Sequence, residues 1–199
     1  MLCLLAFSAS GAVHKIEHQY GPLHKAKVEV KDFSFLRLEG RPLSLREVAQ
    51  GGRVVLITYF AAWCHNSNYD VETINELYAK YKDQGFAVIG VCEYSDAEEL
   101  KRFVAEHKPT YPICLEGGHD TPREETSHFK YRRKTGDLRQ WGTPFNLLVR
   151  AEDIKTKGDT FTKNVHAAAG ELIKAEAEEF IRKQLQLAPA KPTIQDSSH

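Results

Sequence analysis

Residues 54–67 read VVLITYFAAWCHNS, an apolar run that ends at a cysteine. Residues 54–60 are apolar and β-branched without alternation, which is typical of a central strand buried on both faces. The segment from about residue 66 to residue 82 then has helical spacing, because its apolar side chains recur three and four residues apart. The stretch predicts a buried strand that passes directly into a helix, with Cys64 in the first helical turn.

Cys64 therefore occupies an electropositive position. The start of a helix offers free backbone N–H groups and the positive end of the helix dipole. Both favour the thiolate, which is the nucleophilic form of cysteine, and a protonated His65 would add to the effect. The alternative is a small buried apolar residue, although inert cysteines usually lie inside an element. We expect Cys64 to be the one reactive cysteine of the chain.

Strands and helices alternate along the rest of the sequence. Polar–apolar alternation predicts a strand at 31–36, and apolar runs predict further strands at 86–91, 111–115 and 145–149. Capping residues predict helices that begin near Ser44, Ser95 and Thr121, and helical spacing predicts a long amphipathic helix over 167–185. This order predicts an α/β fold with a central, mostly parallel sheet flanked by helices.

The length of 199 residues suffices for one domain with a substantial core. We assign residues 30–187 to this domain, residues 1–29 to a lead-in, and residues 188–199 to a disordered tail with Pro and Ser. Residues 1–12 are apolar and then small, which resembles the end of a signal peptide and favours a periplasmic or secreted protein. An ordinary apolar N-terminus, and with it a cytoplasmic protein, is the alternative.

The charge balance restricts the partners. Lys+Arg and Asp+Glu both number 27, and the resulting net charge of zero argues against nucleic acid or an anionic membrane surface. No stretch beyond the N-terminus is apolar for long enough to span a bilayer. Residues 117–140 are rich in Lys and Arg, which indicates a solvated helix face or, alternatively, contact with an acidic partner.

The spacing of the four cysteines predicts no metal site, because no two of them are close enough to form a zinc knuckle. Cys92 and Cys114 lie in or beside apolar runs, where free buried cysteines are common. A disulfide between these two residues is the alternative.

These features resemble the redoxin branch of the thioredoxin superfamily, which holds the TlpA/ResA-like thiol–disulfide oxidoreductases and their AhpC/TSA relatives. The resemblance begins at Asp32-Phe33 and Gly40-Arg41-Pro42, runs through residues 54–64, and returns at Gly142-Thr143-Pro144. A Trp-Cys pair after an apolar strand, followed later by Thr-Pro before another strand, is a specific combination. The resemblance covers roughly residues 30–187, for which it implies a thioredoxin-like fold.

The resemblance implies that the Thr143–Pro144 bond is cis and faces Cys64, so that the backbone before the proline can pair with an extended substrate. A trans proline at the start of a strand is the alternative. It also implies a role in proton transfer for Asp70, six residues after Cys64, with an exposed helix carboxylate as the alternative. The implied partner is a disulfide- or thiol-containing protein or a small thiol, and no cofactor is implied.

Two departures from the family pattern matter. Ser67 stands where the second motif cysteine would be, which leaves a CxxS motif without the thiol that resolves a mixed disulfide. Ser67 can still donate a hydrogen bond to a Cys64 thiolate. The peroxiredoxin pattern is also missing, because Ile57 and Ala61 replace its Pro and its Thr or Ser.

We therefore expect a thiol–disulfide oxidoreductase that acts through Cys64 alone and is resolved by an external thiol. Cys92 is a candidate internal resolver, although a disulfide requires the two Cα atoms to lie within about 7 Å. The alternatives are a non-catalytic peptide- or protein-binding module that keeps the same groove, and a thiol peroxidase. The residues expected to contact the substrate are Trp63, His65, Thr143 and Pro144.

Overall fold

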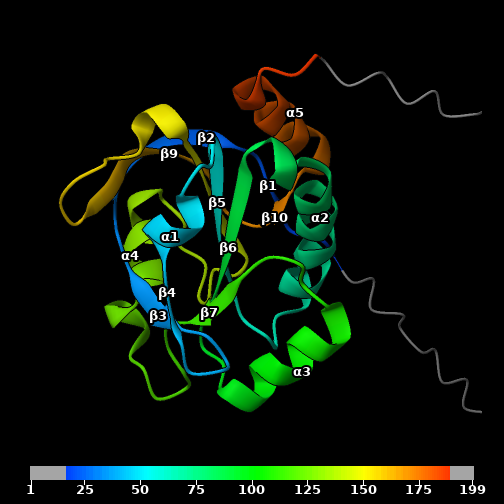
Figure 1. Cartoon of the computed structure of the whole chain (residues 1–199). Coiled ribbons are helices and arrows are strands. Elements are labelled where there is room, and N and C mark those ends of the chain that lie inside the picture. Colours follow the sequence, from blue (N-terminus) through cyan, green and yellow to red (C-terminus); the bar gives the residue numbers. More distant parts are fainter. Residues whose placement is uncertain (1–16, 189–199) are drawn as a thin grey trace, which may run out of the picture.

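Strand β5 (Val54–Phe60) is buried along its whole length, as its unbroken apolar run predicts. It lies inside the 8-stranded sheet of the computed structural model, which describes residues 17–188 (Figure 1). The strands follow the order β2 (His24–Lys31), β9 (Thr160–Ala168), β8 (Phe145–Arg150), β5, β6 (Phe86–Cys92), β7 (Ile113–Leu115), β3 (Ser34–Leu36) and β4 (Pro42–Ser44). Strands β1 (Tyr20–Gly21) and β10 (Glu171–Leu172) form a separate parallel pair.

Helices cover both faces of this sheet. They are α1 (Leu45–Ala49), α2 (His65–Tyr81), α3 (Ala97–His107), α4 (Ser127–Lys134) and α5 (Lys174–Leu185). Residues of α2, α3 and α5 share one apolar cluster with the sheet, whereas α1 and α4 contribute to the cluster on the opposite face. Figure 1 shows α1 and α4 on one side of the strands and α2 and α5 on the other.

The expected mostly parallel sheet is wrong, because only β5–β6 and β6–β7 are parallel among the pairs of the large sheet. Helices α2 and α3 make the crossovers that parallel neighbours require. After β8 the chain instead passes through the short 3₁₀ turn Ala151–Asp153 and returns as β9, a connection that suits antiparallel neighbours. The sheet is therefore mostly antiparallel.

The long helix expected over residues 167–185 begins later, at Lys174. Ala167 and Ala168 belong to β9, where they are fully buried and pair with neighbouring strands. Gly170 then has φ +142°, which favours glycine and ends the extended segment. Burial in the sheet thus overrides the helical propensity of the alanines.

Two other boundaries differ from expectation. The domain begins earlier than residue 30, because β2 starts at His24 and pairs with β9. Part of the segment assigned to a lead-in therefore belongs to the large sheet. The cap expected at Thr121 does not start a long helix; residues Arg123–Glu125 form one 3₁₀ turn. Helix α4 begins instead after Thr126, whose hydroxyl oxygen accepts a hydrogen bond from the Phe129 N–H.

The expectations for residues 1–12 and for the tail from residue 189 onward concern segments outside the described residues. Between residues 17 and 188, each helix is too short or too polar to cross a lipid bilayer.

Candidate active site

Cys64 is the N-cap residue of α2, directly after the turn that follows β5. Its backbone N–H donates to the Ala61 carbonyl at 3.0 Å, and its own carbonyl accepts from the Asn68 N–H at 3.2 Å. The side chain is half-buried, and its Sγ donates to the Thr143 carbonyl at 3.4 Å. The thiol thus lies at the positive end of a helix, where a thiolate is stabilised.

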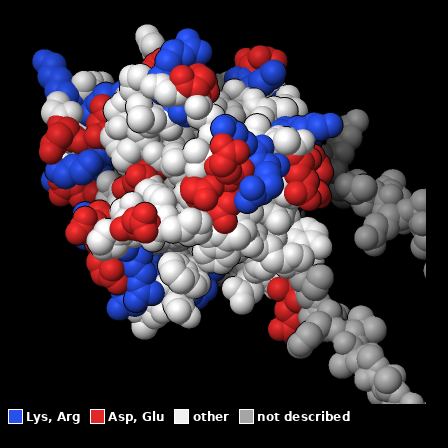
Figure 2. Space-filling model, turned by 90° about the horizontal axis from the view of Figure 1, so that it is seen from below, with Lys and Arg blue, Asp and Glu red and all other residues white. Residues whose placement is uncertain are grey.

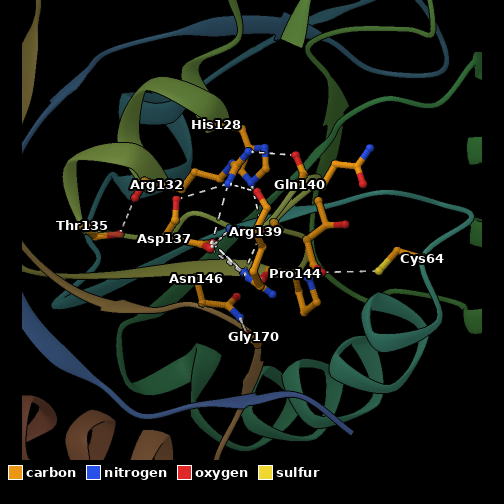
Figure 3. Close-up of polar contacts among 12 residues, drawn as sticks. Cys64, His128, Arg132, Thr135, Asp137, Arg139, Gln140, Pro144, Asn146 and Gly170 are labelled. Carbon is orange, nitrogen blue, oxygen red and sulfur yellow. Dashed lines mark hydrogen bonds and ion pairs between the residues drawn. The ribbon is translucent and has the colours of Figure 1, made fainter. Parts of the chain in front are cut away.

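The loop opposite Cys64 contains the Thr143–Pro144 peptide bond, which is cis. Figure 3 shows Cys64 pointing toward this loop. Thr143 is buried, and among residues 17–188 its hydroxyl has no hydrogen-bond partner. The structure therefore brings the two motifs together, with a backbone carbonyl as the contact.

Ser67 faces the interior and not the solvent. It is 2% exposed, and no described residue bonds to its hydroxyl. It lines a void beside Asp70 and Pro144 that is too small to admit a water molecule. Its neighbour His65 is exposed and contacts the Tyr69 ring edge-to-face, with centroids 4.7 Å apart.

Asp70 is buried and not an exposed helix carboxylate. Its carboxylate accepts hydrogen bonds from the Leu172 N–H and from the Asn146 side-chain amide, both at 2.8 Å. Burial raises the pKa of Asp70 from 3.8 to about 7, against the lowering effect of these two hydrogen bonds. A carboxyl group in this state can gain or lose a proton near neutral pH.

Cys92 and Cys114 are free and fully buried. Burial raises the pKa of each thiol to about 12, so both remain protonated at neutral pH. A protonated, inaccessible thiol is a poor nucleophile, which argues against Cys92 as an internal resolver.

A chain of hydrogen bonds joins the segment before Cys64 to the loop opposite it. The Trp63 indole N–H donates to the Tyr94 carbonyl at 2.8 Å, and the Tyr94 hydroxyl lies 2.8 Å from His128 Nδ1. His128 Nε2 lies 3.2 Å from the Gly142 carbonyl. Burial lowers the pKa of His128 to about 3, so the ring is neutral. Because a carbonyl only accepts, Nε2 carries the proton and Nδ1 accepts from Tyr94.

Two arginines of the basic segment 117–140 donate hydrogen bonds to backbone carbonyls of the loop that contains Thr143 and Pro144 or directly precedes it (Figure 3). Arg132 is 1% exposed and donates to the carbonyls of Arg139 and Gln140 at 2.6 and 3.1 Å. Arg139 pairs with Asp137, with 2.8 Å between Nη2 and Oδ2. The same Nη2 also donates to the carbonyl of Gly142 at 2.9 Å and to that of Pro144 at 3.0 Å.

These arginines and His128 were missed in the sequence, where the charged segment indicated a solvated face or an acidic partner. Lys134 on α4 is indeed exposed, but Arg132 on the same helix is buried. The only signal was their position shortly before Gly142-Thr143-Pro144. On the face in Figure 2, Lys and Arg are interspersed with Asp and Glu and are not gathered into one basic patch.

Within the described residues, one group of side chains has the spacing of metal ligands: Asp96, Glu99 and His119. Asp96 and Glu99 form the capping box of α3, and Glu99 also contacts His119 Nε2 at 2.7 Å. Helix capping and one hydrogen bond account for this group, and it is separate from Cys64 in the sequence.

Comparison with known proteins adds to this geometry. The sequence model of the AhpC/TSA family matches residues 26–140, more than half of the chain. The thiol-disulfide oxidoreductase ResA of Bacillus cereus is 29% identical over 90 residues, which cover 45% of this chain and 51% of that protein. ResA of Halalkalibacterium halodurans is 27% identical over 96 residues, which cover 48% and 53%. The chain spans about half the length of these curated relatives.

Solved structures show the fold. A thiol:disulfide interchange protein from Bacteroides sp. matches with a TM-score of 0.57 and 18% identity, over 87% of this chain and 97% of that one. A thiol:disulfide interchange protein of the thioredoxin family from Chlorobium tepidum matches with a TM-score of 0.55 and 16% identity, over 80% and 97%. These likenesses confirm the thioredoxin-like fold that the sequence predicted.

Proposed function

Because this chain belongs to the AhpC/TSA family, we propose that it catalyses thiol–disulfide exchange through Cys64 as a single redox-active thiol. The observation that carries the proposal is the position of the half-buried Cys64 Sγ, at the N-terminus of α2 and 3.4 Å from the Thr143 carbonyl. The similarity to the ResA proteins supports the same chemistry.

The reaction begins when the Cys64 thiolate attacks one sulfur of a substrate disulfide, R–S–S–R′. The S–S bond breaks, Cys64 becomes disulfide-bonded to R–S, and R′–S⁻ leaves and takes up a proton. A second, external thiolate then attacks the sulfur of R in this mixed disulfide. It forms a new disulfide with R and releases the Cys64 thiolate. Over both steps the external thiol is oxidised and the sulfur of R′ is reduced to a thiol.

An external resolving thiol follows from the side chains near Cys64. The hydroxyl of Ser67 cannot perform thiol exchange, and the thiols of Cys92 and Cys114 are buried and protonated. No other thiol among residues 17–188 can thus resolve the mixed disulfide at Cys64, and the proposal assigns this step to a thiol from solution or from a partner protein.

Asp70 is the proposed proton-exchanging group of the site. It lies on α2, whose N-cap residue is Cys64, and borders the same small void as Ser67 and Pro144. With a pKa of about 7, its carboxyl group can accept a proton as the Cys64 thiol ionises and return it when the thiolate is displaced. The proposed substrate contacts are Trp63, His65, Thr143 and Pro144.

A non-catalytic binding module is the second candidate function. It is favoured by the exposure of Trp63 beside a site in which Ser67 replaces the resolving thiol. A peroxidase is less well supported. Ile57 and Ala61 are both fully buried apolar residues, so neither supplies a hydroxyl to position a peroxide.

The proposed partner is a disulfide- or thiol-containing protein or a small thiol. Disulfide substrates persist in oxidising compartments, which supports a periplasmic or secreted location over a cytoplasmic one.

Mass spectrometry of the intact protein tests the proposal. In a Cys3→Ser background, which removes the thiol outside the described residues, we expect one added 2-mercaptoethanol moiety per chain after incubation with bis(2-hydroxyethyl) disulfide, removed again by excess glutathione. Cys64→Ser should abolish the adduct, whereas the matched variant Cys114→Ser should keep it. An unmodified parent protein, or an adduct that persists in Cys64→Ser, would overturn the proposal.

A further inference from the structure

A hollow of about 420 Å³ lies on one side of the site. Three aromatic side chains form its apolar wall: Trp63, Tyr94 and Trp141. Trp63 directly precedes Cys64, and Trp141 lies two residues before Thr143, whose carbonyl contacts the thiol. The hollow is thus built from both chain segments that meet at Cys64.

The aromatic wall is fixed before any ligand binds. The Trp63 and Trp141 rings meet edge-to-face with centroids 5.7 Å apart, and Tyr94 contacts Trp141 at 5.3 Å. The hydrogen bond from the Trp63 indole to the Tyr94 carbonyl sets the orientation of the first ring. Fixed aromatic rings lose little conformational entropy on binding, which makes them effective anchors for a partner.

Both indoles are nevertheless open to solvent. Trp63 is 44% exposed and Trp141 is 42% exposed, so a large apolar area remains uncovered at this position. Neighbouring exposed apolar side chains of this size mark interaction sites on soluble proteins.

The polar wall of the hollow determines which occupant fits. Glu99 is paired with His119 at 2.7 Å, and the Arg123 guanidinium is paired with Glu124 at 2.7 Å. Arg123 also lies 6.0 Å from the centre of the Trp141 ring. Because the lining carries one carboxylate, that of Glu99, and one guanidinium, that of Arg123, the hollow offers no excess of either sign and suits an uncharged side chain.

We propose that this hollow binds a large apolar side chain, aromatic above all, that neighbours the cysteine of a disulfide-bonded polypeptide. The inference rests on the proposed function of Cys64 and names the substrate class of that site. While Cys64 attacks the disulfide, the adjacent side chain of the substrate lies against the two indoles. The hollow thereby selects among polypeptide disulfides by the residue beside the cysteine.

Gly118 offers a substitution that fills the hollow. It lines the space, and a Cβ atom at this position would lie 3.8 Å from the Ser95 carbonyl oxygen, an ordinary contact distance. Its backbone is outside the left-handed region, so a side chain introduces no strain there. Gly118→Leu should therefore occupy the hollow while both tryptophans remain.

The test compares two capped, symmetric peptide disulfides that differ only beside the cysteine, Phe-Cys-Ala and Ala-Cys-Ala. Rates of adduct formation at Cys64 are followed by mass spectrometry after acid quenching. In the parent protein we expect the Phe peptide to react about tenfold faster. In Gly118→Leu and in Trp141→Ala the ratio of the two rates should fall close to one. Leu36→Ala, an exposed apolar residue outside the hollow, should keep the parent ratio.

A second measurement separates the inference from the proposed function. The same peptides with Ser in place of Cys are titrated while the two indole N–H signals of the protein are followed by NMR, since the chain has only two tryptophans. Shifts with the Phe peptide alone support the hollow even if Cys64 forms no adduct, in which case only the redox proposal fails. Equal rates with both peptides, or a preference that survives Gly118→Leu, would overturn the inference.

Discussion

Arg139 donates a hydrogen bond to the carbonyl of Pro144 at 3.0 Å, and the same nitrogen reaches the Gly142 carbonyl at 2.9 Å. It thereby links the backbone on both sides of Thr143, the residue whose carbonyl contacts Cys64. Asp137 keeps the guanidinium in place through its carboxylate. The geometry of the Cys64 site therefore depends on a side chain that does not touch the thiol.

Arg139→Ala should destabilise the protein by about 2 kcal/mol, because hydrogen bonds from a charged donor to partly buried carbonyls are lost. It should also slow adduct formation at Cys64, since the opposing loop is no longer held. Urea unfolding and the mass-spectrometric assay measure the two effects. Lys134→Ala, an exposed residue of the same basic segment, should change neither. If Arg139→Ala matches this control in both assays, the guanidinium does not position the loop.

Asp70 should make stability depend on pH. Its carboxyl group titrates near 3.8 when unfolded and near 7 when folded, so the protein binds a proton on folding between these values. Raising the pH from 4 to 7 then destabilises the fold by up to roughly 1.4 kcal/mol per pH unit. Asp70→Asn has no titrating group at this position and does not lose stability in this way. The unfolding free energy of the variant minus that of the parent should therefore increase from pH 4 to pH 7 and stay constant above pH 7.

Urea unfolding at pH 4, 5.5, 7 and 8 checks this dependence, with Glu72→Gln on the exposed face of α2 as the control. The control should show a constant difference from the parent. A constant difference for Asp70→Asn as well would contradict the raised pKa.

Ser67→Cys should restore dithiol chemistry. Residues 64 and 67 are three apart at the start of α2 and lie on the same side of the helix. Ser and Cys are similar in size, and no hydrogen bond from the buried Ser67 hydroxyl to a described residue is lost. We expect a mass decrease of about two hydrogens on oxidation as the S–S bond forms, and faster reduction of insulin than by the parent. A disulfide without any gain in activity would favour the binding module over the oxidoreductase.

Among the three cysteines within residues 17–188, iodoacetamide should label Cys64 selectively in the folded protein. Cys92 and Cys114 are fully buried, and burial raises the pKa of each thiol to about 12, so neither presents a thiolate to the reagent. Peptide mapping should find both residues labelled only after unfolding in urea. Labelling of Cys92 at the rate of Cys64 under native conditions would contradict this and revive Cys92 as a resolving thiol.

The part of the fold that could be predicted from the sequence is the part fixed by local pattern. The unbroken apolar run of β5 and the helical spacing after Cys64 each have a single good structural solution, and together they place the cysteine at the start of α2. The match to the AhpC/TSA family confirms the redoxin resemblance that these residues carried.

What could not be predicted depends on long-range contacts. Ala167 and Ala168 favour a helix locally, and only the neighbouring strands make them part of β9. Arg132 is buried because backbone carbonyls from the loop before Gly142 accept its hydrogen bonds, and such acceptors have no sequence signature. Charged residues are usually exposed, so the sequence favoured the wrong environment for this side chain.

The order of strands also bears on how copies of the protein behave in concentrated solution. The formal net charge is zero, so electrostatic repulsion between molecules is weak at neutral pH. Among the described residues, β2 and β4 are the two edges of the large sheet. Three exposed lysines lie along β2, at Lys25, Lys27 and Lys31, and β4 begins at Pro42, which has no N–H to offer. Lysine and proline at sheet edges oppose pairing with a second molecule, so resistance to strand-mediated aggregation comes from these edges and not from overall charge.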